Sequence, residues 1–175
     1  MFDYQPHLTG EVIAMRPVTA EDYPALYALG SDPEVWALHP QADRWRADVF
    51  RAFFEDGLAS GGALVAVCRA TGALAGWSRF SALYADPGEM EIGWTFLGRD
   101  YWGGAYNSDM KRIMLAHAFK FVDQVIFRIG EHNLRSRRAV EKLGATLDDR
   151  TMTMDSAVGP SLSVYYTLSR AAFEG

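Results

Sequence analysis

Hydrophobic and polar residues alternate between positions 89 and 97, where the chain reads E-M-E-I-G-W-T-F-L. The apolar set is Met90, Ile92, Trp94 and Phe96, and the second set is Glu89, Glu91, Gly93 and Thr95. A period of two is typical of a β-strand with one buried face and one wetter face. The pattern therefore predicts a strand over Glu89–Leu97, with Glu91 on the wetter face.

A glycine-rich segment and then a helical pattern follow this strand. Residues 98–104 contain three glycines, and the apolar residues after them recur at helical spacing up to about Val122. This order of strand, loop and helix directs unpaired N–H groups and the positive end of a helix dipole to one place. The segment therefore predicts a binding site for phosphate oxygens.

The remaining patterns predict a mixed α/β fold with about seven strands and about four helices. Helices are expected from Thr19, over Trp45–Leu58, from the glycine-rich loop to Val122 and over Asn133–Leu143. Gly30–Arg44 is expected to be an irregular connection in which a short helical turn near Glu34–Leu38 is an alternative. The other strands are expected at Val12–Val18, Ala63–Cys68, Ala73–Leu83, Val125–Ile129, Arg150–Asp155 and Ser163–Leu168. Tight turns favour a mostly antiparallel sheet that contains one parallel β-α-β unit, and a hairpin around a Gly159-Pro160 turn closes it.

Length and composition indicate a single domain over residues 1–175. No apolar run approaches the ~20 residues of a membrane helix, and residues 1–10 lack the pattern of a secretory signal. We therefore expect a cytoplasmic protein without a membrane partner. The single cysteine, Cys68, cannot form an internal disulfide and is expected to be buried. The formal net charge of −5 disfavours nucleic acid as a partner.

Three motifs give the chain a resemblance to a known family. They are Met15-Arg16-Pro17, the segment Glu91–Asn107, and N-L-R-S at 133–136 followed by V-E-K-L-G-A at 140–145. Together they resemble the GNAT superfamily of acyl-CoA-dependent N-acetyltransferases, in the branch of the ribosomal-protein N-terminal acetyltransferases. The resemblance implies a GNAT-like fold in which the parallel strands splay apart, with acetyl-CoA as co-substrate and no metal. It also implies that a primary amine, either a peptide N-terminus or a small molecule, attacks the thioester directly in a ternary complex.

The resemblance assigns the CoA pyrophosphate to the glycine-rich loop, although an ordinary strand-to-helix turn is the simpler alternative. The expected ligands are the backbone N–H groups of Trp102, Gly103, Gly104, Ala105, Tyr106 and Asn107. Ala105 and Asn107 depart from the family's usual loop, but they keep the N–H groups that phosphate requires. The resemblance also places Phe96 and Leu97 beside the pantetheine arm. Asn133 is expected to bond the pantetheine amides, to cap the helix that follows it, or to do both.

Acetyl transfer to an amine benefits from a base, because the ammonium group must lose a proton before it attacks. By resemblance Glu91 is the candidate base, with Glu89 as its competitor and a purely structural ion pair as the alternative. His117 is a lesser candidate, since its helical position favours a packed core histidine. The tyrosine that many family members use is replaced by Val140. Ser136 matches a serine that lies near the CoA sulfur in the resembling branch, and we assign it hydrogen bonding to that sulfur.

The sequence does not specify the acceptor, and peptide N-termini, antibiotics, polyamines and small amines all stay open. The family builds the acceptor pocket from residues 23–58 and the closing hairpin. The aromatic and histidine residues that qualify as lining are Trp36, His39, Trp45, Tyr84 and Tyr165, and the basic residues considered for the CoA 3′-phosphate are Arg135, Arg137, Arg138 and Lys142. A homodimer is possible. The alternative function is a non-catalytic acyl-CoA-binding or sensor protein on the same fold.

Overall fold

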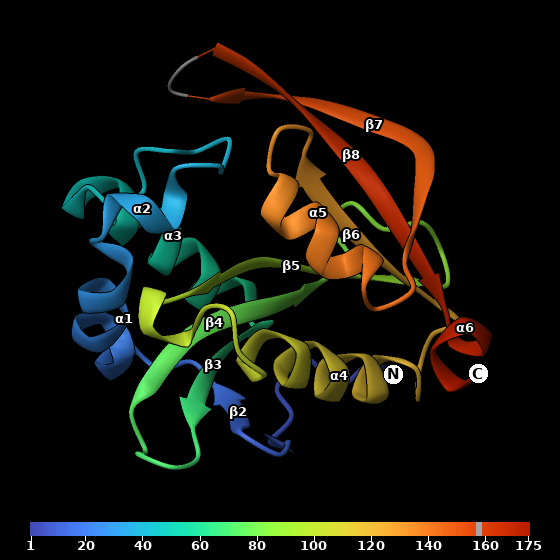
Figure 1. The fold of residues 1–175 in the computed structure, drawn as a ribbon, viewed down its shortest axis with the longest axis horizontal. Coiled ribbons are helices and arrows are strands. Elements are labelled where there is room, and N and C mark those ends of the chain that lie inside the picture. The colour runs from blue at the N-terminus through green and yellow to red at the C-terminus, as the bar shows by residue number, and fades with distance from the viewer. Residues whose placement is uncertain (157–158) are drawn as a thin grey trace.

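The computed structural model describes residues 1–156 and 159–175, and its centre is an eight-stranded sheet (Figure 1). The strands lie in the order β1-β2-β3-β4-β5-β6-β8-β7, and neighbours pair antiparallel except for the parallel pair β5 and β6. The strands are β1 (Leu8–Thr9), β2 (Ile13–Pro17), β3 (Ala63–Cys68), β4 (Leu74–Ser81), β5 (Glu89–Leu97), β6 (Gln124–Gly130), β7 (Thr146–Ser156) and β8 (Gly159–Ser169).

Helices cover both faces of this sheet (Figure 1). The α-helices are α1 (Tyr23–Gly30), α2 (Pro33–Trp36), α3 (Ala47–Ser60), α4 (Tyr106–Ala118), α5 (Leu134–Glu141) and α6 (Arg170–Glu174), and short 3-10 helices lie at Ala20–Asp22 and Arg99–Tyr101. Met114 of α4 and Val140 of α5 belong to one core cluster, on one face of the sheet. Leu26 of α1 and Phe50 of α3 belong to a second cluster, on the opposite face. The sheet therefore separates two cores.

The predicted mixed α/β fold is confirmed, and most predicted elements occur within a few residues of their expected ends. The strands at 63–68 and 89–97 have the predicted bounds, and Gly144 is in the left-handed conformation after α5, with φ of 92°. The sequence pattern missed the short strand β1 and the terminal helix α6. The predicted hairpin turn at Gly159-Pro160 is displaced, because these two residues pair with Ser156 and Asp155. Residues 157–158, which join β7 to β8, lie outside the described residues.

Strand β5 contains a bulge at Trp94 that changes which face its side chains occupy. Two residues of β5 lie opposite one residue of β4 at this point, and Trp94 has φ of 51°, an uncommon conformation for a bulky residue. As a result Ile92 packs in the core with α4, whereas Phe96 packs in the other core with α3. The predicted common face of Met90, Ile92, Trp94 and Phe96 is therefore wrong beyond Ile92, because a period of two does not allow for an inserted residue.

Cys68 and His117 are both buried, as the sequence predicts. Cys68 is 3% exposed and His117 is 6% exposed. Nε2 of His117 lies 2.8 Å from the carbonyl oxygen of Asp3, and its ring contacts the rings of Phe2 and Phe80. The histidine thus ties the start of the chain to α4 and packs as a core residue.

Asp109 links helix α4 to the start of strand β2. Its Oδ2 accepts hydrogen bonds from the N–H groups of Val12 at 2.8 Å and Ile13 at 3.0 Å, in a buried setting. An Asp109→Ala variant leaves both donors without an acceptor, so we expect its free energy of unfolding to fall by about 2–4 kcal/mol. Urea unfolding measures this loss. The control Asp48→Ala, whose side chain is 70% exposed, should change stability by about 0.5 kcal/mol or less. Equal losses in the two variants would contradict the assigned link.

Candidate active site

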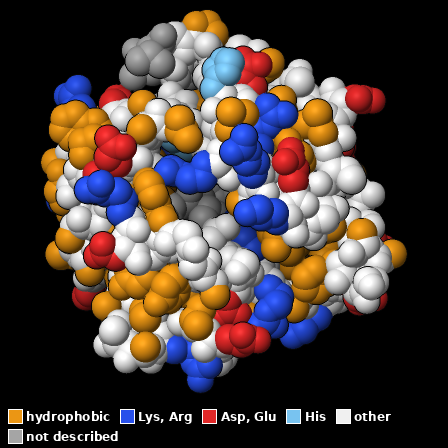
Figure 2. All heavy atoms as spheres, viewed as in Figure 1, with side chains coloured by type: hydrophobic (Ala, Val, Ile, Leu, Met, Phe, Trp, Pro, Cys, Tyr) orange, Lys and Arg blue, Asp and Glu red, His pale blue; other side chains and the backbone are white. Residues whose placement is uncertain are grey.

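Strands β5 and β6 separate soon after they begin. They pair in parallel only from Glu89 to Glu91 of β5, whereas β5 continues to Leu97 and β6 to Gly130. A cavity of about 810 Å³ opens at this gap, and it is lined by residues from α2, α4, α5, β5, β6 and the β7–β8 hairpin. Figure 2 shows a hollow near the centre of this face with lysine and arginine side chains around it. The splayed strands that the sequence motifs imply are thus present.

The glycine-rich loop presents backbone donors at this cavity. Nε1 of Trp102 donates to the carbonyl oxygen of Leu97 at 2.9 Å, which holds the loop against the end of β5. Gly103 has φ of 70°, a conformation that suits glycine. In the part of the chain that the structure describes, the N–H groups of residues 103–105 have no acceptor, and α4 begins directly after them at Tyr106. Free donors and a helix N-terminus at one place suit phosphate oxygens.

Most residues predicted to contact acetyl-CoA line the cavity. Those that do are Phe96, Leu97, Trp102, Gly103, Gly104, Asn107, Asn133 and Ser136, whereas Ala105 and Tyr106 are not among the lining residues. Oδ1 of Asn133 accepts a hydrogen bond from the N–H of Ser136 at 3.2 Å, so the predicted helix cap is present. Phe96 and Leu97 are 4% and 6% exposed and also belong to the two cores.

Glu91 lies buried at the point where the two strands separate. It is 1% exposed, so its predicted position on a wetter face is wrong, because side chains around the cavity cover this part of β5. Its Oε1 is 3.4 Å from Nε of Arg128, and its Oε2 has no partner among the described residues. Burial raises the pKa of Glu91 to about 7, although Arg128 and Arg79 act in the opposite direction. A carboxyl group of this pKa exchanges protons near neutral pH.

Glu89, the alternative candidate base, forms hydrogen bonds away from the cavity. Its two oxygens accept hydrogen bonds from Arg150 at 2.9 and 3.0 Å, and Oε2 also accepts from the N–H of Asp86. It does not line the cavity. The contacts of Glu89 therefore tie β5 to β7 and to the turn before β5. Of the two glutamates predicted as candidate bases, only Glu91 lines the cavity.

Arg44, Arg128 and Lys111 line the cavity, although the sequence did not predict them to belong to the site. Arg128 comes from the middle of β6, and its guanidinium lies 4.1 Å from the ring centroid of Tyr84 and 5.6 Å from that of Trp94. Lys111 comes from α4 and is 5% exposed. The signal for Arg128 was a charged residue within the apolar run V-I-F-R-I. The signal for Lys111 was weaker, since it directly follows a residue of the apolar stripe.

Lys111 is held by hydroxyl groups and has no carboxylate within ion-pair distance among the described residues. Its Nζ donates to Oγ1 of Thr95 at 2.6 Å and to Oγ of Ser78 at 3.3 Å, next to the bulge in β5. Burial lowers the pKa of Lys111 to about 7. An ammonium group that is buried without a counter-charge destabilises the fold, so its position at the cavity suggests a role at the site.

A Lys111→Met variant is expected to change how stability depends on pH. Between about pH 7 and 10.4 the unfolded state keeps the Lys111 proton while the folded state releases it, so the wild type gains stability as pH rises in this window. The variant lacks this gain, and its stability relative to the wild type should fall by up to about 1.4 kcal/mol per pH unit. Urea unfolding at pH 7 and pH 9 measures this difference. The exposed-lysine control Lys120→Met should follow the wild type. A Lys111→Met slope equal to that of the control would show that folding does not lower the pKa of Lys111.

Only some of the residues predicted to line the acceptor pocket or to bind the CoA 3′-phosphate line the cavity. Trp36 and His39 line the cavity, whereas Trp45, Tyr84 and Tyr165 do not. Among the four basic residues of the second motif, Arg135, Arg138 and Lys142 line the cavity and Arg137 does not.

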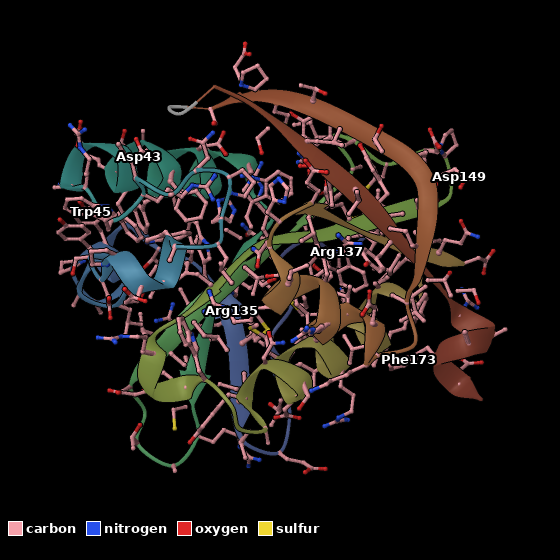
Figure 3. All side chains as sticks on the ribbon, turned by 45° about the horizontal axis from the view of Figure 1, so that its top comes forward. Asp43, Trp45, Arg135, Arg137, Asp149 and Phe173 are labelled. Carbon is pink, nitrogen blue, oxygen red and sulfur yellow. The ribbon has the colours of Figure 1, made fainter. Side chains whose placement is uncertain are left out.

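The two arginines labelled on α5 in Figure 3 differ in their contacts. The Arg135 guanidinium lies 3.9 Å from the ring centroid of Trp102 and donates to the carbonyl oxygen of Val35 at 3.3 Å. Arg137 donates to Tyr166 Oη and to the carbonyl oxygen of Glu131. Arg135 therefore contacts two residues that line the cavity, whereas Arg137 is a structural residue.

Comparisons with known proteins show which protein family and which solved structures are similar to this chain. A family model described as an acetyltransferase (GNAT) domain matches residues 13–146. A candidate acetyltransferase from T. thermophilus is 25% identical with a TM-score of 0.82, over 100% of this chain and 95% of that chain.

Two further solved structures share the fold at lower identity. RimJ of Mycobacterium smegmatis, in complex with CoA-disulfide, is 15% identical with a TM-score of 0.70, over 98% of this chain and 89% of that chain. A candidate ribosomal-protein-serine acetyltransferase from Vibrio cholerae is 13% identical with a TM-score of 0.72, over 94% and 97% of the two chains. No curated protein sequence matches significantly. None of the described helices has the length and apolar character needed to cross a bilayer.

Proposed function

The chain belongs to the GNAT acetyltransferase family, and we propose that it transfers an acetyl group from acetyl-CoA to a primary amine. The acceptor is a peptide N-terminus or a small-molecule amine that attacks the thioester directly in a ternary complex. We further propose that residues 1–175 form one catalytic domain in the cytoplasm, that they need no metal, and that a homodimer is compatible with activity.

One observation carries this proposal. The cavity joins free backbone donors at the start of α4 to the buried carboxyl group of Glu91, through the gap where β5 and β6 separate. A thioester arm that enters between the strands, with its phosphates at residues 102–107, would bring its acetyl group toward Glu91. These residues fit acetyl-CoA, because the donors are unpaired and the cavity has room for the arm.

Each side chain in the proposed mechanism has a distinct task. Glu91 accepts the proton of the ammonium group, directly or through a water molecule, and its pKa of about 7 suits this transfer at neutral pH. Ser136 donates a hydrogen bond to the sulfur, and Asn133 fixes the first turn of α5 on which Ser136 lies. Acetyl-CoA supplies the activated acetyl group. Cys68 is buried in β3 and does not line the cavity, which disfavours a covalent thiol intermediate.

A thiol-release assay tests the proposed function. The purified protein is incubated with acetyl-CoA and a panel of amines of different charge, and free CoA and the acetylated product are measured together. We expect release of CoA that depends on the amine and matches the product formed. A protein that binds acetyl-CoA but releases no CoA with any amine would support the alternative, a non-catalytic acyl-CoA sensor.

A further inference from the structure

Two arginines from distant parts of the chain meet the acceptor side of the cavity. Arg44 lies in the connection between α2 and α3, and Arg128 lies on β6, and both line the cavity with Glu91. Phe127 and Ile129, the neighbours of Arg128, belong to the core under α4. Because side chains alternate along a strand, Arg128 points to the opposite side of the sheet, the side covered by α3. The proposed phosphate loop, in contrast, leads into α4.

Neither guanidinium is paired with a fully ionised carboxylate among the described residues. Nη1 of Arg128 donates to Sδ of Met154 at 2.8 Å, and the nearest carboxylate is that of Glu91, at 3.4 Å from Nε. Nη1 of Arg44 lies 3.1 Å from Nε2 of His39, and no described carboxylate is within ion-pair distance of Arg44. The other buried arginine of this face, Arg79, is paired with Asp56 at 2.6 Å.

The groups that face the two arginines leave an excess of positive charge. His39 is neutral, because burial, Arg44 and Arg128 all lower its pKa. Glu91, with its pKa of about 7, carries only part of a negative charge at neutral pH. Asp155 is exposed on β7 at the rim. Among the groups that line the cavity, the two arginines therefore face at most one partly charged carboxyl group in its interior, while Asp43 and Asp56, which do not line it, also attract Arg44.

The guanidinium groups are also held in place by aromatic rings. Arg44 stacks on Phe53, with its guanidinium carbon 4.2 Å from the ring centroid, and Arg128 stacks on Tyr84 at 4.1 Å. Rings that fix a guanidinium leave its edge available for a ligand, and the planar fork of arginine matches a carboxylate. A buried charge destabilises a protein unless it is paired with an opposite charge. An anionic ligand that binds both guanidinium groups would therefore stabilise this arrangement.

Resting on the proposed acetyltransferase function, we propose that the acceptor is an amine that carries a carboxylate, and that Arg44 and Arg128 bind this carboxylate while Glu91 receives the amine. The amine and the carboxylate are then separated by a few bonds, as in an amino acid or in a peptide with an acidic residue near its N-terminus. Polyamines are disfavoured, because the two arginines repel a second positive charge.

Matched acceptors test the proposal. Each pair consists of a carboxylate and its carboxamide: β-alanine with β-alaninamide for free amino acids, and the peptide Asp-Ala-Ala with Asn-Ala-Ala, both C-terminally amidated, for peptides. With acetyl-CoA saturating, we expect kcat/KM of the wild type to favour the carboxylate member at least about tenfold in one pair. The pair that shows the preference distinguishes a free amino acid from a peptide.

Variants assign the preference to the two arginines. Arg44→Gln and Arg128→Gln should each reduce the preference to about threefold or less, mainly through a higher KM for the carboxylate member. The control Arg46→Gln, in the same connection but with an exposed side chain that does not line the cavity, should keep the wild-type preference. A wild type that uses both members of each pair equally would overturn the proposal while leaving the acetyltransferase function intact.

If no acceptor in the panel is acetylated, a measurement of anion binding tests the proposed carboxylate site. The wild type is first saturated with CoA, so that the phosphate sites are occupied, and is then titrated with sodium sulfate by calorimetry. Binding that weakens at least about fivefold in Arg44→Gln and Arg128→Gln supports the proposal. No binding, or equal binding in the variants, overturns it. Failure of CoA itself to bind would instead refute the proposed function.

Discussion

Replacement of Glu91 with glutamine is expected to lower kcat/KM at pH 7 by about 10²–10⁴-fold, the usual effect of losing a general base. Glutamine has nearly the same shape but cannot accept the proton of the ammonium group. The affinity for acetyl-CoA should change by no more than about threefold, because Glu91 is not placed to contact the phosphates. Steady-state kinetics and a calorimetric titration of the same sample separate these two effects.

The pH profile gives a second signature of the same residue. Since the pKa of Glu91 is about 7, the wild-type rate should rise as pH passes through this value and the carboxyl group becomes ionised. The Glu91→Gln profile should lack this step and recover partly at high pH, where the acceptor itself is deprotonated, above about pH 8 for an α-amino group.

Glu89→Gln is the matched control for this experiment. Glu89 lies two residues away on the same strand, but it pairs with Arg150 and does not line the cavity. This variant should lose stability in urea unfolding and keep its catalytic pH profile. Unchanged turnover in Glu91→Gln would remove Glu91 as the base, and loss of turnover in Glu89→Gln alone would transfer the role to Glu89.

A Gly103→Asp variant is expected to weaken acetyl-CoA binding by about 100-fold or more. A carboxylate about 4 Å from a phosphate charge costs several kcal/mol near a protein surface, and each 1.4 kcal/mol changes affinity about tenfold. An added Cβ at Gly103 would meet no atom within 4 Å, so the effect should come from charge more than from collision. Calorimetric titration with acetyl-CoA measures the loss.

Gly72→Asp controls for backbone strain. Gly72 has φ of 75° against 70° for Gly103, and an added Cβ at Gly72 also meets no atom within 4 Å. Both variants should therefore lose similar stability, but Gly72→Asp should bind acetyl-CoA like the wild type. Equal weakening in the two variants would point to a general effect on the fold, and wild-type affinity in Gly103→Asp would place the phosphates elsewhere.

The sequence predicted the elements that local patterns specify. The strand at 89–97, the glycine-rich loop, the Asn133 cap and the parallel unit all follow from spacing and turn residues, and the structure contains them. The bulge at Trp94 was not predictable in this way, because one inserted residue shifts the pairing without any local signal.

The electrostatic character of the site depends on contacts between distant segments. Glu91 is buried because β6 and the cavity walls cover it, and Arg128 reaches it only after β5 and β6 pair. Arg44 comes from a connection whose path no periodic pattern specifies. Lys111 is unusual only once its burial is known. These residues have ordinary types in the sequence, and their roles arise from tertiary packing.

We expect calorimetric titration of the wild-type protein with acetyl-CoA at pH 7 to show one molecule of acetyl-CoA bound per chain. The expected Kd is about 1–100 μM, a range that corresponds to about 5–8 kcal/mol. Absence of binding by the folded protein up to about 1 mM, equivalent to an affinity weaker than about 4 kcal/mol, would contradict the claim that the gap between β5 and β6 is an acetyl-CoA site.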